Sequence, residues 1–458
     1  MHITRALAEF ATDDHASLHG PELHAAVTAA VIDTVACCVA GGSSPGSRML
    51  HATYEPLPDG QSTVVSTGAT TSPTVAALLN AYDGHVHDLD DIADAINGHP
   101  SVVLVPALVA VAEAFARSGR ELVDAYVVGF EVASAIARLL PARANFEQGW
   151  HTTSVVGVVA AAAGCSRLLG SSVDETQSAL GIAASTASGS RRNFGTHTKA
   201  LHAGVASKNA VLSALLARRG FTSAPDQIEA DAGFLALYGE RPRPRPPAEL
   251  FPDGWTVVSD RGTQMKRWPC CGATHRPAAS ALALAPSVRH RLDRVQRVRV
   301  VQQPGGFLQL IHHRPTTGLQ GKFSAEYVVA AALLDGALSM ASFADSAVTR
   351  PEIVDLLPLV ELAEQPGTAA SPEFAMVEVE VDGEVVRHRT DAFPFLPATD
   401  VNALDAKFHD CARGTAVPWD TTEALRYLKT IGAAPAVDLR PLFASRPRAE
   451  AAEAFSAA

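Results

Sequence analysis

Apolar residues recur at every third or fourth position through most of the first half of the chain. Between residues 22 and 40, Leu23, Val27 and Val31 fall on one face of a helix, and two consecutive glycines follow as a stop signal. The same spacing predicts further helices at residues 74–82, 102–117, 122–140, 153–169, 176–187 and 199–219. No strand-like alternation stands out in this half, which indicates a large all-helical domain.

The pattern changes after an alternating Arg-Pro segment at residues 241–247, where proline excludes helix and favours an extended connection. Beyond this segment, apolar and polar residues alternate at 295–302, 376–381 and 384–389. The Asp-Gly pair between the last two runs predicts a β-hairpin. Helical spacing returns at 278–284, 324–339, 403–412 and 422–431.

These patterns predict a mainly α protein with two domains. We expect a helical domain at residues 1–250, completed by C-terminal helices within residues 396–458. A smaller α+β domain is expected at residues 251–395.

Composition narrows the class of protein. Of the 458 residues, 47% are hydrophobic and 19% charged, and 48 acidic against 37 basic side chains leave a net charge of -11. This composition excludes a disordered chain, and without a cluster of Lys and Arg it disfavours nucleic acid as a partner. Because aromatic residues make up 6%, Ala and Val must form the interior, which favours close helix packing and burial in an oligomer.

The N-terminal segment lacks a continuous apolar signal, and the apolar stretches at 102–112 and 155–165 are shorter than the roughly 20 residues needed to span a bilayer. The six cysteines include no C-x-x-C pair, which argues against a structural zinc site or a disulfide framework. No nucleotide-binding glycine motif occurs. We therefore expect a cytoplasmic protein with reduced thiols, no membrane partner and no cofactor.

Residues suited to chemistry concentrate in four short segments of this charge-poor chain. The first runs from His85 to Ser101 and contains Asp88 and His99. Its composition fits a two-His carboxylate metal site, an acidic loop that caps the next helix, or a site of proton transfer. In the last case, neighbouring His and Asp side chains shift each other's pKa toward neutrality.

The second and third segments lie at predicted helix starts. His151 directly precedes a helix, whose N-terminal amides attract anions. Arg191, Arg192 and Lys199 surround the start of another helix, where the helix dipole disfavours cations. A bound carboxylate would offset that cost, so these residues are candidate anion ligands.

The fourth segment places Lys266 ahead of Cys270, Cys271 and His275. A Cys–His nucleophile requires an orienting third group, and none is evident, so packed thiols are favoured. Lys266 is compatible with anion binding in either case. Together, the four segments indicate one site for a small polyanion.

The order of the motifs resembles the MmgE/PrpD family, which includes 2-methylcitrate dehydratases, cis-aconitate decarboxylases and iminodisuccinate epimerases. The motifs are HDLDD…HPS at 87–101, GWHTTSVVG at 149–157, FGTHTKALHAG at 194–204, RRGFTS at 218–223, KRWPCCGATH at 266–275 and PTTGLQGKFS at 315–324. The resemblance extends over residues 22–431. It implies a large helical domain, a smaller α+β lid domain and a homodimer.

The resemblance also implies the site residues, which are Asp88, His99, His151, Lys199 and Lys266. The sequence departs from the family pattern close to two of them. Ile92 stands in place of a threonine, and the loop before His99 is one residue longer than in the decarboxylases. Trp150 and Thr152 flank the second histidine in place of Phe and Pro. These departures weaken the transfer of a particular substrate.

All three family reactions add or remove a proton at a carbon next to a carboxylate. We expect His99 and His151 to move protons, Asp88 to orient a neighbour, and Lys199 to stabilise the developing charge. Further substrate contacts are expected from Lys266, Arg191, Arg192 and His275.

The predicted substrate is a small di- or tricarboxylate, and the first expectation is a dehydratase of the 2-methylcitrate type. Epimerisation or racemisation of an imino- or amino-dicarboxylate comes second, and decarboxylation of the cis-aconitate type third. Two alternatives from other classes are a non-catalytic carboxylate-binding protein and a metal enzyme.

Overall fold

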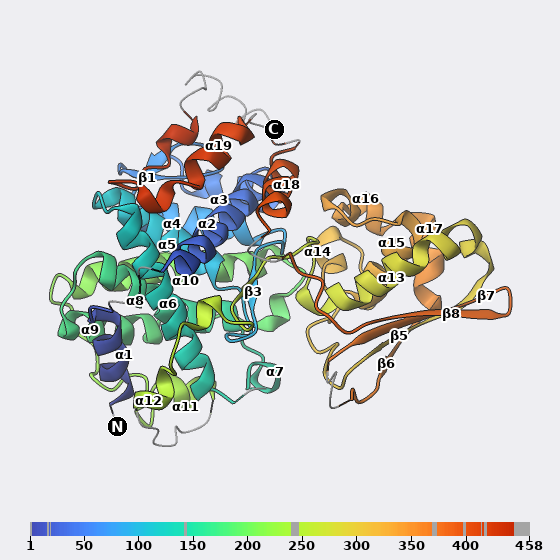
Figure 1. The fold of residues 1–458 in the computed structure, drawn as a ribbon, viewed down its shortest axis with the longest axis horizontal. Helices are drawn as coiled ribbons and strands as arrows, with labels where there is room; N and C mark the ends of the chain where they lie inside the picture. The colour runs from blue at the N-terminus through green and yellow to red at the C-terminus, as the bar shows by residue number, and fades with distance from the viewer. Residues whose placement is uncertain are drawn as a thin grey trace.

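A computed structural model describes residues 2–15, 18, 20–141, 144–239, 247–368, 373–396, 400–413, 415 and 419–443. These residues form a large helical domain and a smaller α+β domain beside it (Figure 1). This architecture confirms the predicted mainly α fold class. The Arg-Pro segment predicted as an extended connection lies outside the described residues, except for Pro247.

The helical domain is formed by long apolar helices, and each predicted helix is present within three residues of its expected ends. Their bounds are α2 (Pro21–Gly41), α4 (Pro73–His85), α5 (Ser101–Ala114), α6 (Gly119–Leu139), α8 (Thr152–Leu168), α9 (Val173–Ser185) and α10 (His197–Ala217). Helix α1 (Ile3–Thr12), which precedes them, was not predicted. Local capping sets two of the starts. Ser118 and Ser172 each form a capping box with the glutamate three residues later.

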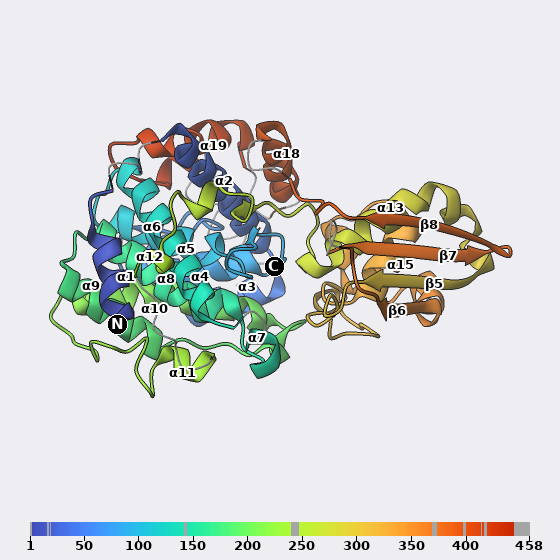
Figure 2. The same cartoon turned by 60° about the horizontal axis from the view of Figure 1, so that its bottom comes forward.

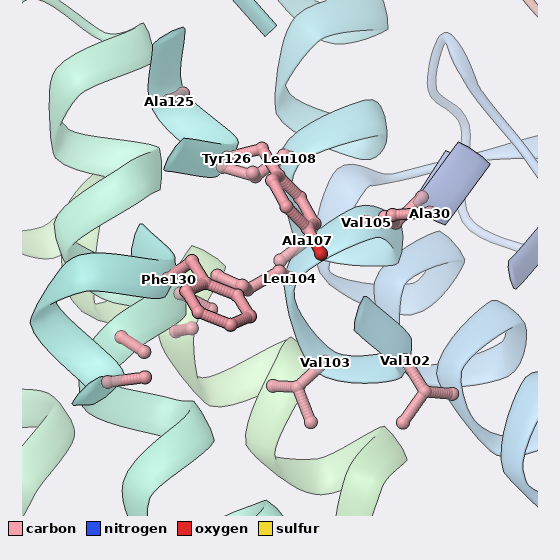
Figure 3. Close-up of a cluster of buried hydrophobic side chains, with 14 of the residues drawn as sticks. Ala30, Val102, Val103, Leu104, Val105, Ala107, Leu108, Ala125, Tyr126 and Phe130 are labelled. Carbon is pink, nitrogen blue, oxygen red and sulfur yellow. The ribbon is translucent and has the colours of Figure 1, made fainter. Parts of the chain in front are cut away.

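Small side chains allow the helices of this domain to pack closely. A Cβ on Gly164 of α8 would lie 2.8 Å from the carbonyl oxygen of Ala125 in α6. A Cβ on Gly204 of α10 would lie 2.8 Å from the carbonyl oxygen of Leu78 in α4. Figure 3 shows a cluster of buried side chains in this core, where Tyr126 of α6 lies beside Leu108 of α5 and small alanines lie around them.

Short elements connect these helices. The remaining helices of the domain are α3 (Pro45–Thr53), α7 (Ala144–Gln148), α11 (Phe234–Tyr238) and α12 (Pro247–Leu250). The strands β1 (Ser62–Thr63) and β2 (Thr70–Thr71) pair with each other, and β3 (Ile92–Ala93) pairs with β4 (Thr263–Gln264). The sequence pattern did not predict these strands, because two residues are too few to show alternation.

The smaller domain contains a four-stranded mixed sheet with helices against it (Figure 2). The strands β5 (Val295–Gln302), β6 (Val360–Glu364), β7 (Ala375–Val381) and β8 (Glu384–Thr390) are arranged in the order β6-β5-β7-β8. The helices are α13 (His275–Val288), α14 (Gly318–Gly321), α15 (Ala325–Asp335), α16 (Asp345–Val348) and α17 (Pro351–Leu356). α13 packs against β7, β8 and α15.

The predicted hairpin is confirmed. Strands β7 and β8 are antiparallel and joined by Asp382 and Gly383, whose φ angles are 55° and 78°. Positive φ at both positions matches the twist of the strands. Strand β6 was not predicted, and it pairs parallel to β5 at the edge of the sheet.

The chain returns to the helical domain at its C-terminal end, where α18 (Val401–Ala412) and α19 (Thr421–Leu428) lie against α2 (Figure 1). Lys407 of α18 forms an ion pair with Asp33 of α2 at 2.5 Å, and both side chains are buried. Lys407 also donates to the carbonyl of Leu89 at 2.7 Å. Helix α18 is therefore held to the loop that follows α4.

Helices α2 and α10 are each 21 residues long and apolar enough to cross a membrane. Within the structure, 78% of the apolar window of α2 and 56% of that of α10 are buried. Both helices pack on α4, so their apolar character is explained by their place in the protein core.

Replacement of Lys407 by Met is expected to destabilise the protein by about 3–5 kcal/mol, because the Asp33 carboxylate would remain buried without a partner. Urea unfolding followed by circular dichroism measures the change. The matched control is Lys429→Met, which removes a more exposed ion pair with Asp405 and should cost less than about 1 kcal/mol. Equal effects of the two substitutions would contradict the role assigned to the buried pair.

Candidate functional site

A cavity of about 1010 Å³ lies between the two domains. The helical domain contributes Asp88, His99, His151, Thr153, Phe194 and Lys199 to its wall, and the smaller domain contributes Cys271, Gln302, Gln309 and Phe323. The predicted chemistry therefore converges on one cavity from segments far apart in the sequence.

The turn after α4 places a carboxylate between two lysines. Asp88 has a φ of 53°, a left-handed conformation that Asp tolerates better than most residues. Its Oδ1 lies 2.7 Å from Nζ of Lys199, in the first turn of α10, and 3.1 Å from Nζ of Lys266, just after β4. All three side chains are buried. One carboxylate oxygen is thus shared by two ammonium groups.

The shared contact controls the charges at the site. Burial opposes ionisation of Asp88, but Lys199 and Lys266 outweigh it and hold the pKa of the carboxyl well below its usual range. Burial also disfavours the charged form of Lys266, but Asp88 and Asp90 outweigh it and raise the pKa of that amine. Two cations around one anion leave an excess positive charge that suits a bound carboxylate.

A second carboxylate, Asp90, lies between two histidines. Its Oδ2 accepts a hydrogen bond from Nδ1 of His85 at 2.8 Å and lies 3.0 Å from Nδ1 of His99. Burial works against ionisation of Asp90, but the two imidazoles outweigh it and hold the pKa of the carboxyl well below its usual range. His99 Nε2 is 3.5 Å from Oδ1 of Asp88, so this ring lies between two carboxylates.

His151 occupies a different environment. It stands directly before α8, its Nδ1 lies 3.2 Å from Nδ1 of His202, and its ring stacks on His85 with centroids 5.8 Å apart. Within the described part of the chain, no carboxylate oxygen forms an ion pair with it. Burial and the charge of Lys199 hold the pKa of His151 well below its usual value.

His99 and His151, the two candidate proton carriers, are therefore both neutral near pH 7, but different neighbours set the pKa of each ring. Burial lowers the pKa of His99, the Asp90 carboxylate opposes this, and Lys266 and Lys199 add to it. No described carboxylate forms a comparable contact with His151. A negatively charged ligand would raise the pKa of both rings, and His99 already has carboxylates that stabilise its protonated form.

Two aromatic rings shield Lys199 from solvent. Its Nζ lies 5.8 Å from the ring centroid of Phe194 and 5.5 Å from that of Phe323. The rings contact each other at 5.0 Å, one from each domain. Such a cation–π environment keeps water away from the ammonium group and strengthens its interaction with an anion.

Other predicted residues are placed differently. Arg191 lines the cavity and donates to the carbonyls of Asn145 at 3.3 Å and Leu308 at 2.5 Å, which joins the two domains. Arg192 is exposed and does not contribute to the cavity wall. In the 3₁₀ turn over Arg191–Asn193, consecutive side chains point in different directions, so Arg191 faces the cavity while Arg192 faces solvent.

His275 is not at the cavity either. Its side chain is fully buried in the smaller domain, where Nε2 accepts from the amide of Trp268 at 3.4 Å. The structure therefore does not bring Arg192 or His275 to the predicted substrate site. Lys266 does not line the cavity either, because its side chain is fully buried against Asp88. Cys271 does line the cavity, and its Sγ donates to Gln309. Burial raises the pKa of the Cys271 thiol to about 11, which disfavours a thiolate nucleophile.

Asp90, His202 and Lys322 are among the polar residues of the site that the sequence prediction missed. Asp90 stands in the acidic segment already singled out, two residues after Asp88. His202 follows Lys199 by three residues and so lies on the same helix face. Lys322 lies in the PTTGLQGKFS segment, and its role depends on contacts that spacing does not reveal.

The group His85, Asp88, Asp90 and His99 also has the donor types of a metal site, with candidate ligand atoms within 4.8 Å of one another. However, two ammonium groups already contact Asp88 Oδ1. A divalent ion there would face both positive charges at short range. The arrangement fits proton transfer better than metal binding.

Comparison of the sequence with known proteins gives matches along most of the chain. Residues 5–247 match the MmgE/PrpD N-terminal domain, and residues 268–426 match the MmgE/PrpD C-terminal domain. The chain is 31% identical to cis-aconitate decarboxylase from Homo sapiens over 375 residues, which cover 77% of this chain and 75% of that protein. It is 27% identical to cis-aconitate decarboxylase from Aspergillus terreus over 351 residues, 71% of each chain. These matches confirm the resemblance seen in the motifs.

Replacement of Asp88 by Asn is expected to destabilise the protein by about 3–5 kcal/mol at pH 7, because Lys266 would lose its buried counter-ion. The folded pKa of Asp88 lies below the unfolded value of about 3.9, so its contribution is complete above that value. It is lost as the pH falls through the folded pKa.

The difference in unfolding free energy between wild type and Asp88→Asn should therefore stay constant from about pH 8 to pH 5. Urea titrations at several pH values measure it. The matched control is Asp405→Asn, which breaks an ion pair with Lys429 that is more exposed than the pair between Asp88 and Lys266. A difference that already disappears near pH 6 would contradict a depressed Asp88 pKa.

Proposed function

Because the chain belongs to the MmgE/PrpD family, as an enzyme of the lyase class acting on carboxylates, we propose that it dehydrates a small hydroxy di- or tricarboxylate. The proposed reaction moves a proton at the carbon next to a carboxylate and uses the protein's own side chains. The supporting observation is one cavity lined by Lys199, Asp88 and two imidazoles, with the fully buried Lys266 on the same Asp88 oxygen as Lys199.

The lysines provide the first part of the chemistry. Removal of a proton next to a carboxylate places negative charge on that carboxylate, which becomes enolate-like. Lys199 and Lys266 lie 2.7 and 3.1 Å from the same oxygen of Asp88, so their positive charges are concentrated at one point. Fixed charges in a site shielded from water stabilise such a developing anion more strongly than solvent does.

The histidines divide the proton transfers. His151 lacks a neighbouring carboxylate among the described residues, stays neutral, and would accept the proton from carbon. His99 lies beside Asp90 and Asp88, which stabilise its charged form once a polycarboxylate raises its pKa. It would donate its proton to the departing hydroxyl. The C–H and C–O bonds break, a C=C bond forms, and water leaves.

Decarboxylation is the second candidate, because the relatives described above are named cis-aconitate decarboxylases. In that reaction the C–C bond to one carboxylate breaks, CO₂ leaves, and the remaining carbanion takes a proton from His99. The same lysine pair would stabilise the anion. Since dehydration needs a base and an acid while decarboxylation needs one acid, the two reactions place different demands on His151.

Proton NMR in heavy water separates these possibilities. The purified enzyme is mixed with 2-methylcitrate, citrate, cis-aconitate, substituted malates or iminodisuccinate. Dehydration predicts a new vinylic product from a hydroxy acid, with deuterium exchange at the α carbon of the starting acid if proton removal is reversible. Decarboxylation predicts loss of a carboxylate from cis-aconitate. Epimerisation predicts deuterium exchange at the α carbon without loss of water or of a carboxylate. Binding of these acids without any exchange or product would contradict the proposed enzyme chemistry.

Replacement of His99 or His151 by Gln is expected to lower kcat about 10²–10⁴-fold, because each removes one proton carrier. For a dehydratase both substitutions should have large effects, and the pH profile should lose the limb due to the missing group. Steady-state rates between about pH 5.5 and 9 measure this. His290→Gln, at an exposed position outside the cavity, is the control. Full activity of His151→Gln with loss in His99→Gln would favour decarboxylation.

A further inference from the structure

Three successive carbonyl groups in the loop after α4 each accept a hydrogen bond from a buried lysine. The donors are Lys322 to His87 at 3.0 Å, Lys266 to Asp88 at 2.9 Å and Lys407 to Leu89 at 2.7 Å. The lysines come from three separate parts of the chain, namely the smaller domain, the junction after β4 and the C-terminal helix α18. The loop that bears Asp88 is therefore held through its backbone.

Lys322 differs from the other two lysines. Lys266 and Lys407 each contact a carboxylate, whereas no carboxylate of the described residues forms an ion pair with Lys322. Its ammonium group donates to the carbonyls of His87 and Pro269 at 3.0 and 2.8 Å and lies 4.6 Å from the ring centroid of Phe343. A buried charge without a counter-ion is costly, so these contacts must hold it.

Burial makes the charged form of Lys322 costly. Its side chain is 3% exposed. Burial lowers the pKa of its amine to about 7, although the charge of Asp88 opposes the shift. An apolar side chain would avoid this burial penalty. A lysine at this position therefore suggests a role beyond packing.

Lys322 also joins the two domains at the cavity. It follows α14 in the smaller domain, while the His87 carbonyl belongs to the helical domain. Its own carbonyl accepts from the amide of Cys271 at 3.0 Å, which ties it to the segment after Lys266. The next residue, Phe323, lines the cavity and contacts Lys199 through its ring.

The orientation of Asp88 depends on this loop. The peptide between His87 and Asp88 ends in a residue with φ of 53°, so rotation of that peptide would move the carboxylate away from Lys199. Lys322 holds the carbonyl oxygen of this peptide. The amide of Asp88 on its other side donates to the carbonyl of His85 at 3.1 Å. Both ends of the peptide are thereby fixed.

We propose that Lys322 is a positioning residue, which holds the His87–Asp88 peptide so that Asp88, supported by the buried Lys266, places Lys199 for a substrate carboxylate. The site is then complete when the smaller domain is seated on the helical domain. This inference rests on the proposed function for its effect on catalysis, whereas its effect on the loop itself is independent of any substrate.

The catalytic test uses Lys322→Ala and Lys322→Met in the full-length protein, with the substrate that wild type turns over. A displacement of the Asp88 loop by about 1 Å is expected to lower kcat/KM about 10²-fold. In Lys322→Ala, added n-propylamine should restore about a tenth or more of the lost activity in a saturable manner, because its ammonium can occupy the vacated position. Folded variants with wild-type kcat/KM would overturn the proposal, and so would an activity loss that the amine does not reverse.

The structural test measures hydrogen exchange by mass spectrometry in peptides that span residues 85–91. Lys322→Met keeps the side-chain volume but removes the donor, and exchange in this segment should be about tenfold faster or more, with α6 unchanged. Lys429→Met is the control and should leave both regions as in wild type. If Lys322→Ala does not fold, Lys322→Met still tests the proposal. Unchanged exchange at residues 85–91 overturns it.

The two tests also separate this inference from the proposed function. If no carboxylate reacts with wild type while Lys322→Met still loosens residues 85–91, the function is wrong and the role of Lys322 in the loop stands. If wild type is active and the loop is unaffected in Lys322→Met, the function stands and the positioning role is wrong.

Discussion

The site depends on the sharing of one Asp88 oxygen by Lys199 and Lys266. Each of these groups is buried, and each alone would be expensive to keep charged in that environment. The two short contacts compensate for the lost hydration, and they favour the charged forms of Asp88 and Lys266. The result is an excess of positive charge at a point that solvent reaches poorly, beside two neutral imidazoles. The proposed binding of a carboxylate and the proposed stabilisation of an enolate both rest on this arrangement.

The rest of the fold can be understood as the support that this charge cluster requires. Lys199 begins α10, which packs closely on α4 because Gly204 allows the backbones to approach. α4 in turn ends just before Asp88. The smaller domain contributes Phe323 to the shielding of Lys199. A core of small side chains gives little freedom to these helices, so packing adds to the lysine contacts in maintaining the distances between charged groups.

Local patterns were sufficient to predict many elements. The hairpin turn at Asp382 is encoded by neighbouring residues, and the structure contains the hairpin where the pattern placed it. The capping boxes at Ser118 and Ser172 were not predicted, and α6 and α9 begin three residues before their expected starts. Strand β6 was missed because it is a short edge strand whose pairing with β5 depends on distant residues. Among the predicted site residues, Arg192 and His275 share a segment with true cavity residues but point elsewhere. Proximity in sequence does not determine the direction of a side chain within an irregular turn.

The sequence by itself determined the helical and α+β regions, the family and the residue types available for chemistry, because periodicity and motifs are properties of short segments. The tertiary structure decided which of these residues meet. It joined Asp90 to both His85 and His99, set His151 against His202, and brought Lys322 to the backbone of the Asp88 loop across the domain boundary. These contacts link residues far apart in the chain or depend on a left-handed backbone turn. They arise from packing of whole elements, and that information is distributed over the entire chain.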